Sequence, residues 1–268
     1  MSKRCLSFLS ALVLGCVLIL SGCAAGGRKQ AANFIKDYYQ GWIDGNISAE
    51  VDYDDYLSQQ SKDLLGLTRE EYISNLNTSQ ESINVKFTDI EVVGEEKMDH
   101  EIYRIRRTLT STSNAGEQKD TGYDYVIQEN GEMRILQYGA FEKKDFQMPA
   151  EKPRALNITM PTAYTTVDSM VLRLDVKNES STNYAIGYMG NGQIVVTTDK
   201  GEFTQEMQIP PETLMMATGT RTGLFEIDKA RGEIQKVTIN NIYALGSNLR
   251  PVNVHNSFSM TIYDVAGY

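Results

Sequence analysis

The sequence predicts two domains, an α+β domain followed by an all-β domain. Between residues 31 and 76 apolar side chains recur with helical spacing, whereas from residue 83 onward they recur at every second position, as in strands. All six prolines lie at or after Pro149, so the second half also differs in composition. Helices, then an antiparallel meander, then short strands throughout is the element order expected of an α+β domain joined to an all-β domain.

The first 22 residues have the organisation of a secretory signal peptide. Lys3 and Arg4 give a positive start, an apolar run covers residues 6–20, and small residues precede Cys23. The run is shorter than the roughly 20 apolar residues that a spanning helix needs. We therefore expect cleavage before Cys23. The alternatives are an uncleaved anchor helix or an ordinary signal with a chance cysteine.

The residues Leu20-Ser21-Gly22-Cys23 resemble the bacterial lipobox. The resemblance implies that Cys23 carries a diacylglycerol anchor, that the membrane is a partner, and that the protein works outside the cytoplasm. Residues 23–30 then form a lipidated tether. Cleavage removes Cys5 and Cys16, so no disulfide can form within the mature chain.

The charge of the mature chain is strongly negative. Without Lys3 and Arg4 it carries 24 basic and 35 acidic side chains, a net charge of −11. Nucleic acid is not expected as a partner, because binding phosphates requires a basic surface.

The first domain is predicted to span residues 31–147 and to begin with helices. Residues 31–43 form an aromatic-rich helix that Gly45 ends, and short helices follow over residues 48–65. Thr68-Arg69-Glu70-Glu71 fits a capping box that opens a third helix through Leu76. Four strands with period two come next, and Asn130-Gly131 predicts a tight hairpin before the last. Their alternating apolar residues are Ile83, Val85 and Phe87; Tyr103, Ile105 and Leu109; Tyr123, Tyr125 and Ile127; and Met133 and Ile135.

This order of elements resembles the nuclear transport factor 2-like fold, also called cystatin-like. In that fold a curved sheet wraps a long first helix into a cone, and the cone often holds a small molecule. The resemblance covers about 120 residues and rests on the aromatic first helix and the order of elements. It implies a ligand pocket lined by inward-facing side chains, for which we predict Tyr38, Trp42, Tyr103, Arg107, Tyr123 and Tyr125.

Two alternatives concern these lining residues. Arg107 shares the alternation of Tyr103 and Ile105, so in a regular strand its guanidinium points into the cone, where its charge needs a partner that an anionic ligand could supply. A bulge at Arg106-Arg107 would turn Arg107 out to solvent instead. The aromatic residues could line a pocket or form plain core.

Residues 148–155, with Pro149 and Pro153, are predicted to be the linker between the domains. The second domain, residues 156–268, shows seven or eight short strands separated by turn signals such as Asp199-Lys200-Gly201. This pattern favours a β-sandwich.

The second domain resembles the immunoglobulin-like domain of uncharacterised Gram-positive lipoproteins. The resemblance rests on the corner Val176-Lys177-Asn178 and on the approach to Phe225 through Gly219 and Gly223. It implies a cell-surface module and a Gram-positive host, although the sequence leaves open a host with one membrane or two.

No motif points to catalysis, a metal or a cofactor. His100 and His255 are isolated from other ligand-type residues, and the segment Asp52-Tyr53-Asp54-Asp55 lacks the spacing of a calcium loop. We interpret that segment as a solvated, acidic helix start. The predicted function is a non-enzymatic binding or scaffold module at the cell envelope, with another envelope protein or a small molecule as partner. The alternative is a small-molecule-binding protein or enzyme that uses the cone.

Overall fold

The computed structural model describes residues 26–83, 85–113, 116–147, 155–187, 191–207, 214–215 and 219–267. The predicted signal peptide, Cys23 and nearly all of the predicted linker lie outside the described residues. Among the described residues, no helix is long and apolar enough to cross a membrane.

The chain divides into two compact units, residues 1–139 and residues 140–268. The predicted boundary therefore differs from the structure by eight residues. Strand β5 (Ala140–Asp145) precedes the predicted linker, yet it pairs antiparallel with β6 (Leu156–Thr166) of the second unit. Pro149 and Pro153 therefore lie in a connection within the second unit, between β5 and β6, and not between the two units.

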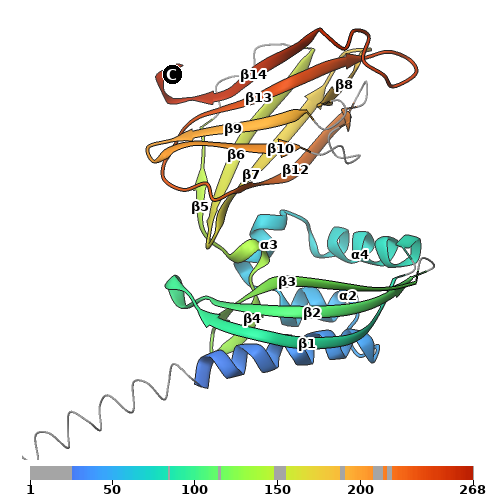
Figure 1. The fold of residues 1–268 in the computed structure, drawn as a ribbon, viewed down its shortest axis with the longest axis vertical. Helices are drawn as coiled ribbons and strands as arrows, with labels where there is room; N and C mark the ends of the chain where they lie inside the picture. The colour runs from blue at the N-terminus through green and yellow to red at the C-terminus, as the bar shows by residue number, and fades with distance from the viewer. Residues whose placement is uncertain are drawn as a thin grey trace, which may run out of the picture. The chain divides into compact units, whose positions relative to one another are not determined.

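The first unit combines short helices with one antiparallel sheet, in the strand order β1-β2-β3-β4 (Figure 1). A first helix covers residues 26–43. It is followed by α2 (Ala49–Val51), the π-helical turn η1 (Asp52–Tyr56), α3 (Gln59–Leu65), α4 (Arg69–Ile83), β1 (Lys86–Lys97), η2 (Asp99–Glu101), β2 (Tyr103–Ser113), β3 (Gly116–Glu129), β4 (Glu132–Ile135) and η3 (Gln137–Gly139).

Local sequence signals explain several of these boundaries. The capping box that opens α4 is confirmed: the backbone N–H of Glu71 donates to Thr68 Oγ1 at 3.2 Å, and the backbone N–H of Thr68 donates to Glu71 Oε2 at 2.9 Å. The hairpin turn is confirmed as well, with φ of 53° at Asn130 and 88° at Gly131. The strand predicted to include Ile83 starts only at Lys86, because α4 continues through Ile83.

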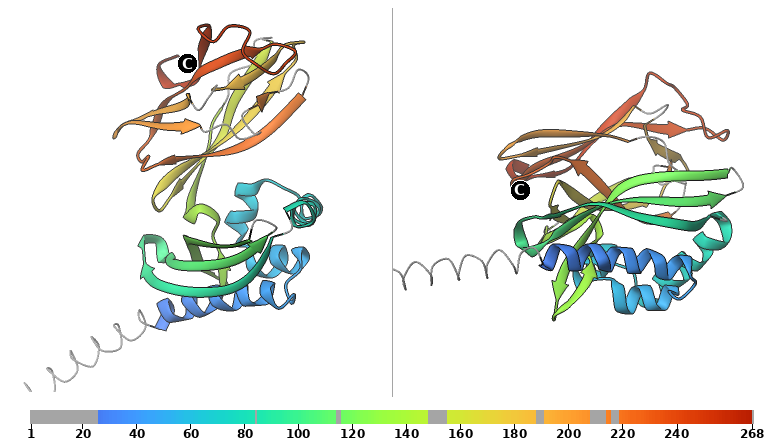
Figure 2. Two further views of the ribbon diagram at one scale, coloured as in Figure 1. Left: turned by 45° about the vertical axis from the view of Figure 1, so that its right-hand side comes forward. Right: turned by 60° about the horizontal axis from the view of Figure 1, so that its bottom comes forward.

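The core of the first unit lies between the first helix and one face of the sheet. Ala31 and Ile35 of the helix pack against Ile105 and Val126 of the sheet, and all four are fully buried. Figures 1 and 2 show the helix running along this face, called the inner face below. The predicted α+β character of the first domain is confirmed.

The second unit is built of two antiparallel sheets. One has the order β12-β7-β6-β5, and the other has the order β10-β9-β13-β8-β11 with β14 paired to β13. After β5 and β6 its strands are β7 (Ser169–Asn178), β8 (Asn183–Ile186), β9 (Gly192–Thr198), β10 (Gly201–Met207), β11 (Leu214–Met215), β12 (Gly219–Asp228), β13 (Ile234–Leu245) and β14 (Ser257–Asp264), and η5 (Val265–Gly267) follows.

Residues from both sheets form one core in the second unit. Leu172 and Leu174 of β7 join Ile194 of β9 and Ile239 of β13, and each is fully buried. The predicted all-β character is confirmed. Sequence inspection missed β6, which contains Pro161. The structure tolerates this proline because the register of β6 on β7 shifts between Thr159 and Thr162.

Candidate functional site

Arg107 lies on the inner face of the sheet, with Tyr103 and Ile105. The pairing of β2 with β3 shows no register shift, so the alternation along β2 is kept through Arg107. The irregularity opposite Arg106 and Arg107 lies on the neighbouring strand β1, whose register shifts between Val92 and Gly94. Arg107 therefore points toward the first helix, and its side chain is only 13% exposed.

The chain itself supplies the partners of this guanidinium. Arg107 Nη1 lies 2.8 Å from Asp120 Oδ2, and Nε lies 3.2 Å from Asp124 Oδ2. Nε also donates to the Tyr39 hydroxyl at 3.4 Å, and that hydroxyl donates to Asp124 Oδ1 at 3.2 Å. Burial, followed by the charge of Asp124, raises the pKa of Tyr39 to about 12. The anionic partner that the sequence requires is thus a pair of aspartates from β3.

Gly122 leaves room for this arrangement. It pairs directly with Arg107 across the two strands, and a Cβ at this position would lie 3.0 Å from Arg107 Nη1. A larger side chain would therefore press on the guanidinium.

A second buried acid, Asp52, begins η1. The residue is 3% exposed. Its Oδ2 accepts a hydrogen bond from the Tyr72 hydroxyl, and its Oδ1 has no hydrogen-bond partner among the described residues. Burial raises the pKa of Asp52, against the opposing effect of the Tyr72 and Tyr38 hydroxyls. The prediction of a solvated acidic segment holds for Asp54, which is 45% exposed and pairs with Arg69. It is wrong for Asp52, because this residue faces the core.

Replacing Asp52 with asparagine is expected to change how stability depends on pH. An acid whose pKa is raised by folding keeps its proton in the folded state where the unfolded chain has lost it, so the stability that it contributes declines as pH rises through the folded pKa. The asparagine side chain has no such proton to lose. The unfolding free energy of Asp52→Asn minus that of wild type should therefore increase from pH 4 to pH 8, as measured by urea unfolding of both proteins.

The exposed Asp89 provides the matched control, because Asp89→Asn removes the same charge from the surface of β1. If the wild-type and Asp52→Asn stabilities change in parallel with pH, Asp52 does not titrate as a buried acid.

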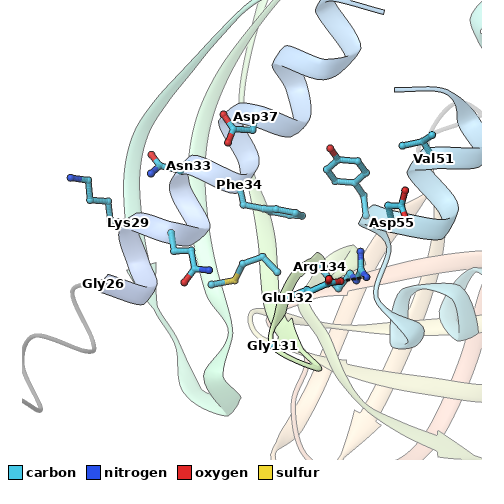
Figure 3. A pocket seen from close by; sticks show the side chains of 13 residues that line it. Gly26, Lys29, Asn33, Phe34, Asp37, Val51, Asp55, Gly131, Glu132 and Arg134 are labelled. Atoms are coloured by element: carbon cyan, nitrogen blue, oxygen red, sulfur yellow. Dashed lines mark hydrogen bonds and ion pairs between the residues drawn. The ribbon is translucent and has the colours of Figure 1, made fainter. Parts of the chain in front are cut away.

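An open groove of about 860 Å³ lies between the first helix, η1 and the β3–β4 turn (Figure 3). Its floor is apolar, with Phe34 and Tyr56 at a ring-centroid distance of 5.7 Å and Met133 buried beside them. Charged side chains stand on its walls, among them Asp37 of the first helix and Asp55 of η1. The groove offers apolar contact below and ionic contact at the rim.

Contacts on the far side of η1 fix the wall of the groove. Leu57, directly after η1, is 2% exposed and forms a parallel bridge with Ile135 of β4. The hydroxyl of Ser61 donates to the Ile135 carbonyl at 2.8 Å. The ion pair of Asp54 with Arg69, at 2.7 Å, joins η1 to α4. These contacts hold Asp55 and Tyr56 in place.

The structure does not gather the six predicted lining residues around one pocket. Tyr38 packs against Trp42 and other rings of the core, Tyr103 is 6% exposed, and Arg107 is held in its ion pairs. Tyr123 and Tyr125 do not face the first helix, since their neighbours Asp124 and Val126 occupy the inner face. Tyr123 is 52% exposed, and the Arg104 guanidinium lies 5.1 Å from its ring centroid.

None of these six residues lines the groove. The groove residues of the first helix escaped sequence inspection because they lie on a second stripe of that helix, beside the aromatic face. The spacing of Phe34 and Asp37, three residues apart, was the available signal. Asp55-Tyr56 has no such pattern, since a π-helical turn departs from the helical period.

The described residues contain no group of three or more His, Cys, Asp or Glu side chains placed to hold a metal ion. Neither a protein-family model nor a curated protein matches the sequence. The function is therefore argued from the geometry of the chain.

Proposed function

We propose that this protein is an extracytoplasmic lipoprotein that acts as a binding module at the cell envelope and holds its ligand in the groove of the first unit. The groove carries this proposal. Its volume of about 860 Å³ falls within the roughly 300–1,000 Å³ of ligand sites in proteins. Its apolar floor and charged rim are the combination by which such sites gain affinity and orientation.

The membrane anchor in this proposal is a lipid on Cys23, and the host is a bacterium, with a Gram-positive surface favoured. The support is the order of the N-terminal residues: positive start, apolar run and Leu-Ser-Gly-Cys. The described part of the first helix begins at Gly26, which lines the groove, so the ligand would bind close to the anchored end of the chain.

The fold assignments belong to the same proposal. A helix packed along one face of a four-stranded antiparallel sheet is consistent with a nuclear transport factor 2-like cone. Two antiparallel sheets around a shared core are consistent with an immunoglobulin-like sandwich. Both are common as binding or accessory modules, which favours a partner protein at the envelope.

A ligand inside the cone is the less favoured alternative. The side chains that would line such a site contact one another: Arg107 is neutralised by Asp120 and Asp124, and Tyr38 packs against Trp42 and Tyr56. A molecule in this space would have to displace them.

Photo-crosslinking in intact cells tests the proposal. A benzophenone side chain at Asn33, on the exposed rim of the groove, should give a crosslinked product in the membrane fraction. The same group at Lys36, which is exposed on the same helix but does not line the groove, is the control. Cys23→Ser should release the protein from the membrane fraction. Equal products from both positions, or none from Asn33, would contradict the groove as the binding site.

A further inference from the structure

Two carboxylates line one end of the groove. Asp37 belongs to the first helix and Asp55 to η1 (Figure 3), and the Tyr56 ring next to Asp55 packs against the Phe34 ring of the first helix. Burial and then the charges of Asp55 and Asp37 raise the pKa of the Tyr56 hydroxyl, so both carboxylates act on the same ring. Neither carboxylate forms an ion pair within the described residues.

The basic side chains of the groove do not neutralise this end. Arg134 is paired with Glu132 on the opposite wall. Lys29 also lines the groove, but it precedes Asp37 by eight residues, which is about 12 Å along a helix. Within the part of the chain that the structure describes, the two carboxylates of this end therefore have no ion-pair partner.

The aromatic floor beside these carboxylates suits a cation on an apolar stem. Phe34 and Tyr56 offer aromatic rings, and the negative face of such a ring attracts a cation placed over it. Met133 continues the apolar surface, against which a methylene chain can pack. The carboxylates supply the charge, and the floor supplies contact for the stem.

We propose that this end of the groove binds a lysine or arginine side chain from an extended segment of a partner protein. The inference rests on the proposed function, because it names the chemistry of the ligand that the groove receives. A protein segment is favoured over a free amine because the open groove has a volume of about 860 Å³, far larger than one ammonium group with its methylene chain.

Calorimetric titration of the mature, unlipidated Cys23→Ser chain tests the proposal. The probe is a short peptide with two lysines separated by leucine, and its acetyl-lysine version is the uncharged comparison. Asp37→Asn and Asp55→Asn should each weaken binding about threefold to fivefold, because an exposed ion pair contributes up to about 1 kcal/mol. The double variant should weaken it tenfold or more. Asp89→Asn, an equal loss of charge outside the groove, should change it less than twofold.

The outcomes separate this inference from the proposed function. If Phe34→Leu weakens binding while both asparagine variants bind like wild type, the groove is the site but the cation assignment is overturned. If Phe34→Leu and the asparagine variants all bind like wild type, the groove itself is excluded and the proposed function fails. If 1,5-diaminopentane binds as tightly as the peptide, the partner is a small amine rather than a protein segment. Acetyl-lysine peptide binding at full affinity would also overturn the proposal.

Discussion

Replacing Arg107 with methionine is expected to lower the unfolding free energy of the first unit by about 2–4 kcal/mol. Removing one partner of a buried ion pair typically costs about 3–5 kcal/mol because the other charge stays buried. The side chains of Arg107 and Asp124 are 13% and 19% exposed. Because water still reaches part of both groups, the expected loss of stability is slightly smaller than for a fully buried pair. Asp124 and the Tyr39 hydroxyl would both lose the guanidinium that now contacts them.

The deficit of Arg107→Met should grow with pH. Burial raises the pKa of Asp124, and Arg107 opposes that rise. Without the guanidinium the pKa of Asp124 rises further, and the stability contributed by an acid with a raised folded pKa declines as pH rises through that pKa. Urea unfolding at pH 4 and pH 7 should therefore show the smaller loss at pH 4.

Arg106 is the matched control for this experiment. It is the neighbouring residue on β2, it is exposed, and Arg106→Met removes the same charge and adds the same side chain. We expect its effect to stay within about 0.5 kcal/mol. The double variant Arg107→Met/Asp124→Asn should recover part of the loss, since the uncompensated carboxylate is gone. Equal losses from Arg106→Met and Arg107→Met would contradict the buried network.

The boundary between the units predicts a second large effect. A fragment of residues 140–268 is expected to fold, whereas a fragment of residues 148–268 should be less stable by about 3 kcal/mol or more. The shorter fragment lacks β5, so β6 becomes an exposed edge. It also lacks Phe146, whose ring contacts Tyr263 at a centroid distance of 4.9 Å and whose N–H donates to the Pro161 carbonyl at 2.9 Å.

Thermal unfolding and size-exclusion chromatography of the two fragments would measure this difference. Phe146→Ala in the longer fragment distinguishes the contribution of the Phe146 ring from that of the β5 backbone. We expect this variant to lower the unfolding free energy by about 2 kcal/mol, less than the roughly 3–5 kcal/mol typical of a fully buried phenylalanine. Equal stability of the two fragments would place the boundary at the prolines, as the sequence alone predicts.

This boundary could not be read from the sequence because strand pairing is not local. Pro149 and Pro153 mark a break in regular structure, and that inference rests on the backbone chemistry of proline. Whether the residues before the break pair with the first sheet or with β6 depends on contacts across the break. The capping box at Thr68 and the turn at Asn130-Gly131 were predictable, since each depends on residues within a few positions.

The candidate site shows the same limit. The alternation of β2 indicated that Arg107 could face inward, but the phase of β3 was ambiguous because Tyr123, Tyr125 and Val126 are all apolar or aromatic. The pairing of β3 with β2 decides which residues of β3 face the first helix, and it places Asp124 on that inner face. The tyrosines predicted to line a pocket therefore point the other way, and the partner of Arg107 was not foreseen.

Methyl NMR of the mature Cys23→Ser chain tests the central claim most directly, namely that the groove of the first unit is the binding site. With labelled methionine methyl groups, Met133 reports on the groove floor, while Met160 and Met170 report on the core of the second unit. On titration with the lysine peptide, we predict that the Met133 signal shifts progressively to saturation while the signals of Met160 and Met170 stay in place. Saturating binding that leaves the Met133 signal unchanged would contradict the account.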